Sequence, residues 1–310
     1  MIITCPNCST RYQIDDARLN KARIKVRCAK CKHVFVVRVR GSDQERNTKT
    51  EHKAQIDTNS CVTLTVCNQK GGVAKTSSCL NIGVSLALLG KRVLLVDFDV
   101  QANLSVLLGK FNAKSFFDVM DSQDKSIDHH IVATDYKLSL LPSNSKMALL
   151  AKKHMQQGNY EYLLAEKLNE IKNRYDYILI DTPPSGDFFT LNALLASDAA
   201  IIPTQCEYLS INGVDHVIRM IDVINKKKAH GLDYKVLVTM FNAEITAANV
   251  ILSKIKVKYS NHLLNGIIPM DGKLQESHIS QKPLHFYDSS CPAANEYTAV
   301  ARELIEAQLK

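Results

Sequence analysis

The sequence lacks any long uninterrupted apolar stretch. Among its 310 residues, no run approaches the ~18 apolar residues that a membrane-spanning helix needs, so we do not expect the chain to cross a bilayer. Residues 1–8, MIITCPNC, also lack the basic stretch and apolar core of a secretory signal. We therefore expect a cytoplasmic protein, whose nine cysteines serve as metal ligands or free thiols rather than in disulfides.

The composition is also free of the extremes that mark unfolded or fibrous chains. Hydrophobic residues make up 45% of the sequence and charged residues 23%, with only 12 glycines. These values exclude a wholly disordered chain and a collagen-like chain. The length allows one large domain, or a large domain with a small one attached.

Most of the chain has no excess of charge of either sign. The net charge of +8 comes from residues 1–41, which contain ten Lys and Arg residues and two Asp residues. The remaining residues contain 29 basic and 29 acidic side chains. Attraction to a polyanion is therefore expected to arise mainly in the first forty or so residues.

Four cysteines near the start of the chain form two Cys-x-x-Cys pairs. These are Cys5 with Cys8 and Cys28 with Cys31, separated by nineteen residues. The spacing is typical of a tetrahedral zinc site. Residues 24–27 and 34–37 flank the second pair and are expected to form strands. About forty residues bury too little core to fold alone, so zinc would supply much of the folding free energy.

The segment resembles the short zinc-ribbon domains found at the start of some bacterial proteins. Its ten basic side chains leave three roles open. Arg38 and Arg40 alternate along the last expected strand, which favours a face that binds nucleic acid. Docking on a protein and a purely structural role are the alternatives. Residues 41–60 are polar and aperiodic, so we expect a flexible linker between the ribbon, residues 1–40, and residues 61–310.

A glycine-rich loop follows the next apolar segment. Residues 61–68, CVTLTVCN, are typical of a buried strand, and a helical pattern through Leu80 and Val84 follows the loop. The loop consists of Gln69, Lys70, Gly71, Gly72, Val73, Ala74, Lys75, Thr76 and Ser77. Glycines let backbone N–H groups close on phosphates at the N-terminus of a helix. We expect Lys75 to reach the β- and γ-phosphates of a nucleotide, and the Thr76 hydroxyl to bind Mg²⁺.

This loop departs from the strict phosphate-loop pattern, because Gln69 and Ala74 occupy two of its glycine positions. It matches the deviant form K-G-G-x-x-K-[ST], in which Lys70 is an additional lysine. With this loop the sequence resembles the ParA/MinD family of P-loop ATPases. Later segments resemble motifs of the family in the same order, at residues 90–103, 177–185, 201–208 and 268–297. The resemblance covers residues 61–310 and implies ATP and Mg²⁺ as cofactors.

The apolar runs predict the architecture of this larger part. Strand-like runs lie at residues 62–67, 93–97, 138–141, 177–181, 199–203, 236–241 and 264–268. Their alternation with helical segments predicts an α/β fold, a doubly wound and mostly parallel sheet with helices on both faces. The phosphate loop is expected directly after the first of these strands.

Three carboxylates stand at the ends of predicted strands, where open parallel sheets bind their ligands. We expect Asp181 to hold Mg²⁺, directly or through water. Asp99 is expected to orient the attacking water, and Asp97 to support either Mg²⁺ or the loop. Each could alternatively cap a helix, because each precedes a turn. Val100 and Ala102 replace the usual proline and glycine of the family, so the turn after Asp99 departs from its pattern.

The resemblance also assigns roles to residues outside these motifs. In the family the additional lysine crosses to the phosphates of a partner subunit, so Lys70 implies a homodimer that encloses ATP. Its charge would offset the negative charge that builds in phosphoryl transfer. Asn242 and the backbone near Pro269 are candidates for recognition of adenine. A strand-end cap and a rigid turn are the alternative interpretations of these two residues.

Other branches of the family fit the sequence less well. A membrane-binding relative of the MinD type would end in a basic amphipathic helix. This chain ends in AVARELIEAQLK, whose mixed charges are typical of a closing helix packed on its domain. Nitrogenase-type reductases need cysteines that hold an iron–sulfur cluster between subunits. The remaining five cysteines form no close pair and are expected to be buried.

The partition branch binds DNA without sequence preference through scattered basic residues. Candidates here are Lys226 to Lys228, then Lys254, Lys256 and Lys258, and finally Lys273, which alone could replace a usual arginine. A solvated helix face is the alternative. We expect the basic ribbon to supply part of the DNA affinity.

The leading hypothesis is an ATPase of slow, partner-stimulated turnover that binds non-specific DNA as an ATP dimer. It would segregate a plasmid, chromosome or other cargo over the nucleoid with a ParB-like adaptor or a cargo protein. The alternative is a regulatory ATPase whose ribbon docks on a protein or nucleic-acid partner without DNA-based transport. A stand-alone metabolic enzyme is the remaining alternative.

Overall fold

The computed structural model describes residues 2–13, 23–38, 61–111, 113–122, 126–155, 158–226 and 231–307. The chain divides into two units, residues 1–55 and residues 56–310, and each is described by itself. The predicted linker, residues 41–60, includes this boundary and lies outside the described residues.

The small unit consists of two antiparallel hairpins. Strand β1 (Ile2–Thr4) pairs with β2 (Arg11–Gln13), and β3 (Arg23–Arg27) pairs with β4 (Val34–Arg38). The two strands predicted around the second cysteine pair are thus confirmed. Each hairpin turn contains one Cys-x-x-Cys pair, so the two turns bring the thiols of residues distant in sequence into one cluster.

The large unit is built on an eight-stranded sheet of order β12-β11-β10-β5-β9-β6-β8-β7. The strands are β5 (Val62–Val66), β6 (Val93–Asp97), β7 (Val132–Ala133), β8 (Ser139–Leu141), β9 (Tyr177–Asp181), β10 (Ala199–Thr204), β11 (Asp233–Phe241) and β12 (Leu263–Pro269). All seven predicted strands are present and parallel. The eighth, β7, is a two-residue edge strand antiparallel to β8, too short to show a pattern in the sequence.

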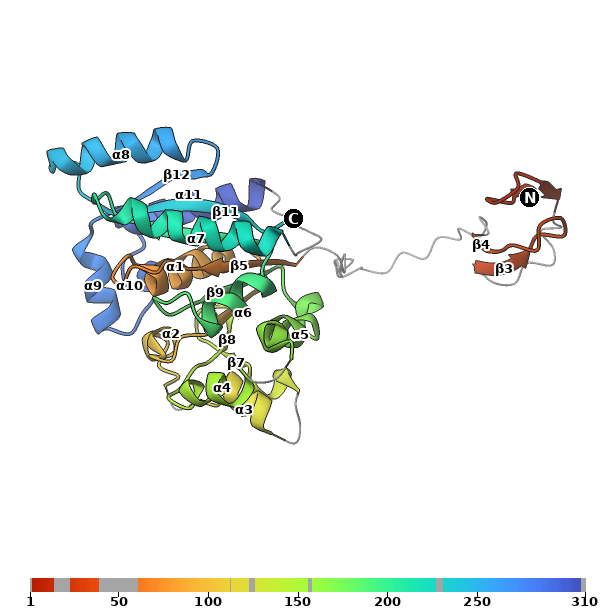
Figure 1. Ribbon diagram of the computed structural model, residues 1–310, viewed down its shortest axis with the longest axis horizontal. Helices are drawn as coiled ribbons and strands as arrows, with labels where there is room; N and C mark the ends of the chain where they lie inside the picture. Colours follow the sequence, from red (N-terminus) through yellow and green to blue (C-terminus); the bar gives the residue numbers. More distant parts are fainter. Residues whose placement is uncertain are drawn as a thin grey trace, which may run out of the picture. The chain divides into compact units, whose positions relative to one another are not determined.

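Helices cover both faces of this sheet (Figure 1). The helices are α1 (Lys75–Leu88), α2 (Asn103–Leu107), α3 (Phe116–Asp121), α4 (Met147–His154), α5 (Leu163–Asn169), α6 (Phe188–Ala196), α7 (Ser210–Asn225), α8 (Thr246–Lys258), α9 (Gly272–Ile279), α10 (Leu284–Tyr287) and α11 (Pro292–Glu306). Helices α1 and α11 pack in one core, whereas α3 to α8 contribute to two cores on the other face. The doubly wound fold is therefore confirmed.

Strand β6 illustrates why both faces need cover. Val93 and Leu95 belong to the core under α1, and Leu94 and Val96 belong to the core under α3 to α6. Successive side chains of a strand point to opposite faces. A strand that is apolar at every position can therefore bury all its side chains only in the middle layer of a three-layer fold.

The closing helix α11 packs against α1 and β12, as its sequence predicts. Its apolar face, which includes Tyr297, Val300 and Leu304, is buried in the same core as α1. Among the residues that the structure describes, no helix is both long and apolar enough to span a membrane. Residues 308–310 lie outside the described part of the chain.

Candidate nucleotide site and zinc centre

The four cysteines of the small unit form one cluster. The Sγ atoms of Cys5, Cys8, Cys28 and Cys31 all lie within 4.8 Å of one another, and two of these pairs are 3.6 Å apart. Four thiolates at about 2.3 Å from one zinc ion would be separated by about 3.8 Å. Cys5 and Cys28 are buried. The cluster therefore fits the predicted tetrahedral zinc site.

Two hydroxyl groups contact this thiol cluster, and the sequence interpretation missed both. The Tyr12 hydroxyl lies 3.1 Å from Cys28 Sγ and accepts a hydrogen bond from the Lys30 N–H, which directs its own proton toward the sulfur. Thr10 Oγ1 lies 3.2 Å from Cys8 Sγ. The Tyr12 hydrogen bond is the main reason that the pKa of Cys28 falls to about 5. A thiolate at this position is therefore favoured.

In the large unit, the glycine-rich loop lies between β5 and α1, as predicted. Gly71, Gly72 and residues 74–77 line a cavity of about 300 Å³, together with Asp99, Asn103, Pro184 and Met240. Gly72 and Ala74 both have positive φ angles, 74° and 62°. These angles turn the chain so that α1 begins at Lys75 with its N-terminus toward the cavity. Val73 is fully buried under the loop, and Gln69 points away toward α7.

Lys75 is the buried cation of the cavity. Its side chain is 8% exposed, and its Nζ donates a hydrogen bond to the Lys70 carbonyl over 3.1 Å. Burial lowers the pKa of Lys75, whereas the nearby carboxylates of Asp181 and Asp99 oppose that shift. A phosphate group in the cavity would replace the backbone carbonyl as the partner of this ammonium group.

Asp181 is the residue that best fits a metal ion. It ends β9, is fully buried, and neither carboxylate oxygen has a hydrogen-bond partner of regular geometry. Burial raises its pKa well above the ordinary value, and the nearby Thr76 hydroxyl lowers it in part. A buried carboxylate without partners is costly unless a cation neutralises it. Asp181 with the Thr76 hydroxyl therefore fits Mg²⁺, which prefers oxygen ligands.

Asp97 and Asp99 differ in their surroundings, although they are two residues apart. Asp97 Oδ2 accepts hydrogen bonds from both the N–H and the hydroxyl of Ser105, over 2.8 and 2.6 Å. These contacts join Asp97 to α2. Its predicted support of Mg²⁺ or of the glycine loop stays a prediction. Asp99 is 4% exposed and lines the phosphate cavity. Burial raises its pKa, and Lys75 opposes the shift.

Lys70 is not among the residues that line this cavity. Its Nζ donates hydrogen bonds to Glu207 Oε2, Ser210 Oγ and Gln205 Oε1, over 2.5, 2.9 and 3.3 Å. Gln205 Nε2 in turn donates to the Gly72 carbonyl. The turn between β10 and α7 therefore holds both Lys70 and the glycine loop. The sequence pattern pointed to residues 201–208 as a family motif but gave these side chains no role.

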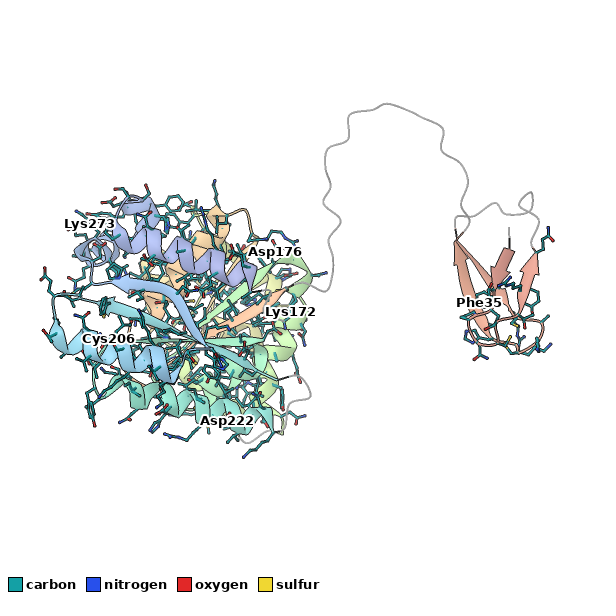
Figure 2. All side chains as sticks on the ribbon, turned by 90° about the horizontal axis from the view of Figure 1, so that it is seen from above. Phe35, Lys172, Asp176, Cys206, Asp222 and Lys273 are labelled. Carbon is teal, nitrogen blue, oxygen red and sulfur yellow. The ribbon has the colours of Figure 1, made fainter. Side chains whose placement is uncertain are left out.

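A second cavity, of about 520 Å³, lies beside the first and shares Met240 with it. Its lining is mostly apolar and includes Asn242, Met270 and Cys206, which is labelled in Figure 2. Pro269 itself does not line the cavity, whereas Met270, the next residue, does. Asn242 Oδ1 accepts a hydrogen bond from the Glu244 N–H. Asn242 thus caps the strand end, and its amide group also borders a cavity of suitable size for a nucleobase.

The lysines predicted to contact DNA are only partly free. Lys258 forms an ion pair of 2.6 Å with Asp215, and Lys273, labelled in Figure 2, pairs with Glu276 over 2.9 Å. Lys254 and Lys256 are exposed on α8. Lys226 is exposed at the end of α7, and Lys227 and Lys228 lie outside the described residues. Of the five candidate lysines that the structure describes, two are therefore already paired with acidic residues.

Comparison with known proteins identifies the family of this chain. The model of an AAA domain matches residues 61–234, and that of a zinc-ribbon domain matches residues 1–36. The chromosome-partitioning ATPase Soj of Treponema pallidum is 33% identical over 250 residues, which cover 78% of this chain and 96% of that protein. The chain belongs to the ParA/Soj family of ATPases. The sporulation initiation inhibitor protein Soj of Bacillus subtilis is likewise 33% identical, over 78% of this chain and 97% of its own.

Solved structures share the fold of the large unit. A cobyrinic acid a,c-diamide synthase from Mycobacterium smegmatis, with bound ADP and magnesium, is 30% identical with a TM-score of 0.69. It covers 79% of this chain and 94% of that one. A plasmid partition protein of Borrelia burgdorferi, bound to AMPPNP, has a TM-score of 0.70 at 24% identity and shows the shared fold. It covers 79% of this chain and 99% of its own.

Proposed function

We propose that this ParA-like ATPase binds Mg²⁺ and ATP between its glycine loop and the ends of β6 and β9, and hydrolyses ATP slowly. The observation that carries the proposal is Asp181, a fully buried carboxylate with no regular hydrogen-bond partner, close to Thr76 and Lys75. Asp181 and the Thr76 hydroxyl would hold Mg²⁺, which would neutralise the buried carboxylate and offset phosphate charge. Lys75 holds the phosphates, and Asp99 orients the water that attacks them. The adjacent apolar cavity bordered by Asn242 accepts the base.

We propose further that ATP brings two copies of the chain together. Lys70 lies outside its own phosphate cavity and is held by Glu207, Ser210 and Gln205. A lysine in that place can reach phosphates only after it leaves these partners. In a homodimer it would contact the γ-phosphate of the partner subunit and offset the negative charge that develops in hydrolysis. The contacts with Glu207 would keep it inactive in the single subunit.

The ATP dimer is proposed to bind DNA without sequence preference and to segregate a plasmid, chromosome or other cargo. The described ribbon exposes Arg11, Arg27, Lys30 and Lys32, and such side chains neutralise phosphates. The large unit is close to charge-neutral, and two of its candidate lysines are already paired with acidic residues. The ribbon therefore supplies part of the affinity, in a cytoplasmic, nucleoid-associated protein. A ParB-like adaptor or a cargo protein would stimulate hydrolysis and so release the dimer.

The decisive experiment measures binding to a random-sequence DNA duplex with ATP or with ADP. The full chain is compared with the chain lacking residues 1–40 and with Lys75→Ala. We expect tight binding with ATP only, weaker binding and a smaller salt slope without the ribbon, and none for Lys75→Ala. Deletion that leaves both affinity and salt slope unchanged would refute the role of the ribbon.

A different result would support the alternative function. If neither the full chain nor the truncated chain binds DNA in an ATP-dependent manner, the protein is better described as a regulatory ATPase whose ribbon docks on another macromolecule. Turnover gives a second criterion. A partner-free rate above ~1 s⁻¹, in the range of metabolic enzymes, would argue against a switch.

A further inference from the structure

A chain of buried hydrogen bonds holds the backbone of Asp99 from two sides. The Asp99 N–H donates to Asp97 Oδ1 over 3.3 Å. The Asp99 carbonyl accepts from the Ser143 hydroxyl over 2.5 Å and from the Ala102 N–H over 3.0 Å. The Gln101 N–H donates to the Oδ1 atom of the Asp99 side chain over 2.9 Å. Asp99 is therefore fixed at its amide, its carbonyl and one carboxylate oxygen.

Ser105 links Asp97 and Ser143, the two residues that hold the Asp99 amide and carbonyl. Its hydroxyl donates to Asp97 Oδ2 over 2.6 Å and accepts from the Ser143 N–H over 2.9 Å. Ser105 belongs to α2, Asp97 to the end of β6, and Ser143 to the loop after β8. All three side chains are fully buried. The end of β6, helix α2 and the loop after β8 are thus tied together next to Asp99.

We propose that Ser105 and Ser143 are positioning residues for ATP hydrolysis, which set the Asp99 carboxylate at the phosphate cavity. The proposal rests on the proposed function, because it concerns the residue that orients the attacking water. Neither serine lines the phosphate cavity, whereas Asp99 does. Their effect is therefore exerted through the Asp99 turn and not through the nucleotide.

The sequence of the turn gives a reason for the hydrogen bonds of Ser105 and Ser143. Val100 follows Asp99 where the resemblance to the family leads one to expect proline, whose ring would fix the backbone. Ala102 holds a left-handed conformation, with φ of 53°, that is unfavourable for an L-residue. The hydrogen bonds within the turn, from the Ala102 and Gln101 N–H groups to Asp99, are supplemented from outside it by Ser143 and Asp97.

The test compares Ser143→Ala and Ser105→Ala with the full-length wild type in single-turnover ATP hydrolysis and in nucleotide binding. Displacement of a catalytic carboxylate by about 1 Å can lower the rate of hydrolysis by up to about 100-fold. We expect each variant to lower the hydrolysis rate about 10-fold or more while the Kd for ATP changes less than about 2-fold. Ser85→Ala is the matched control, because this buried serine of α1 donates to the Asn81 carbonyl within its own helix.

The same substitutions are then made in an Asp99→Ala background. If the serines act through Asp99, they should cause no further loss in rate there. An equal loss in both backgrounds, an unchanged rate, or a parallel loss of ATP affinity would each overturn the proposal. Ser143→Thr keeps the hydroxyl and should retain more activity than Ser143→Ala. It provides the test of the Ser143 hydroxyl if Ser143→Ala folds poorly.

Failure of the proposed function would look different from failure of this inference. Loss of hydrolysis in Asp99→Ala with normal rates in both serine variants would overturn the inference alone. A wild type that does not hydrolyse ATP at all, with or without DNA, would overturn both. Thermal unfolding of each variant shows how much stability the lost hydrogen bond contributed.

Discussion

At the scale of single residues, two alanines show how the glycine loop and the Asp99 turn depart from their usual sequences. Ala74 and Ala102 both adopt left-handed backbone conformations, with φ of 62° and 53°. This conformation costs an L-residue about 1 kcal/mol, and glycine avoids the cost. The strict phosphate-loop pattern has glycine at the first position, and the resemblance to the family implies glycine at the second. The structure adds the reason, which is backbone geometry.

Ala102→Gly should therefore stabilise the protein by roughly 0.5–1 kcal/mol. The relief of the left-handed strain outweighs the greater entropy that glycine gives the unfolded chain. Chemical denaturation of the large unit measures the gain. Gly109→Ala is the reverse control, since Gly109 has φ of 66° and open space around it, and it should be destabilising. Equal loss of stability in both variants would show that the backbone strain at Ala102 is negligible.

The buried carboxylate of Asp181 predicts a dependence of stability on pH and metal. Its pKa lies well above its ordinary value of 3.8 because of burial. A raised pKa means that stability is greatest below pH 3.8 and is lost as the pH rises through the folded-state pKa. Without Mg²⁺ and nucleotide, Asp181→Asn should therefore raise Tm, and the gain should be larger at about pH 8 than at about pH 5.

Thermal unfolding at these two pH values, with and without Mg²⁺ and ATP, checks this prediction. The same variant should lose most of the stabilisation that Mg²⁺ and ATP give the wild type, because the metal loses its carboxylate. Asp135→Asn, an exposed residue, serves as control and should change neither quantity. A lower Tm for Asp181→Asn at about pH 8 without metal would contradict the interpretation of Asp181 as an uncompensated charge.

At the scale of elements, the two hairpins of the ribbon use the same turn twice. Ser9 and Lys32 hold left-handed conformations at equivalent places, and each N–H donates to the carbonyl of the first cysteine of its turn. The hairpins differ in their contacts, because the Tyr12 hydroxyl forms a hydrogen bond with Cys28 Sγ in the second hairpin. Tyr12 comes from β2 of the first hairpin and so links the two halves around the metal.

Tyr12→Phe should weaken zinc binding about 10-fold, the lower end of what partners of metal ligands contribute. The change removes one hydrogen bond to Cys28 and leaves the ring in place. Competition with a chromogenic zinc chelator measures the affinity, and NMR of the full chain follows the fold of the ribbon. Gln13→Glu or another change at the exposed end of β2 is a suitable control. An unchanged zinc affinity would show that the hydroxyl serves only the fold.

At the scale of the whole molecule, charge and catalytic chemistry belong to different units. The ribbon contains the net positive charge, and the large unit contains the phosphate cavity, which Asp99 lines, and the buried carboxylate of Asp181. Two lysines proposed for DNA contact in the large unit are already paired with acidic residues. DNA affinity and ATP hydrolysis should therefore respond separately to mutation of the two units.

A matched pair of double substitutions tests this separation in the full chain. Lys30→Gln with Lys32→Gln should reduce the slope of log K against log salt for DNA by up to about 2, since each phosphate contact contributes about 0.9. Lys137→Gln with Lys152→Gln removes the same charge from exposed sites of the large unit and should change the slope little. Equal effects of the two pairs would mean that net charge alone determines the affinity.

The sequence by itself determined the chemistry of both sites and the class of fold. Cysteine spacing, glycines before a helix and apolar strands that end in aspartate are local patterns, and each follows from short-range geometry. The seven parallel strands could be predicted because each contains a short run of apolar or β-branched residues and alternates with helical segments. The edge strand β7 could not, since two residues form a strand only by pairing with β8.

Only the tertiary structure decided which of the predicted side chains have partners. Asp97, Asp99 and Asp181 look alike in the sequence. In the structure Ser105 donates to the carboxylate of the first, Ser143 donates to the backbone carbonyl of the second, and the carboxylate of the third has no regular partner. The same holds for Lys70, whose partners lie 135 to 140 residues away, in the turn after β10 and at the start of α7. Hydrogen-bond partners so distant along the chain are brought together by the packing of the sheet, so no local pattern in the sequence contains them.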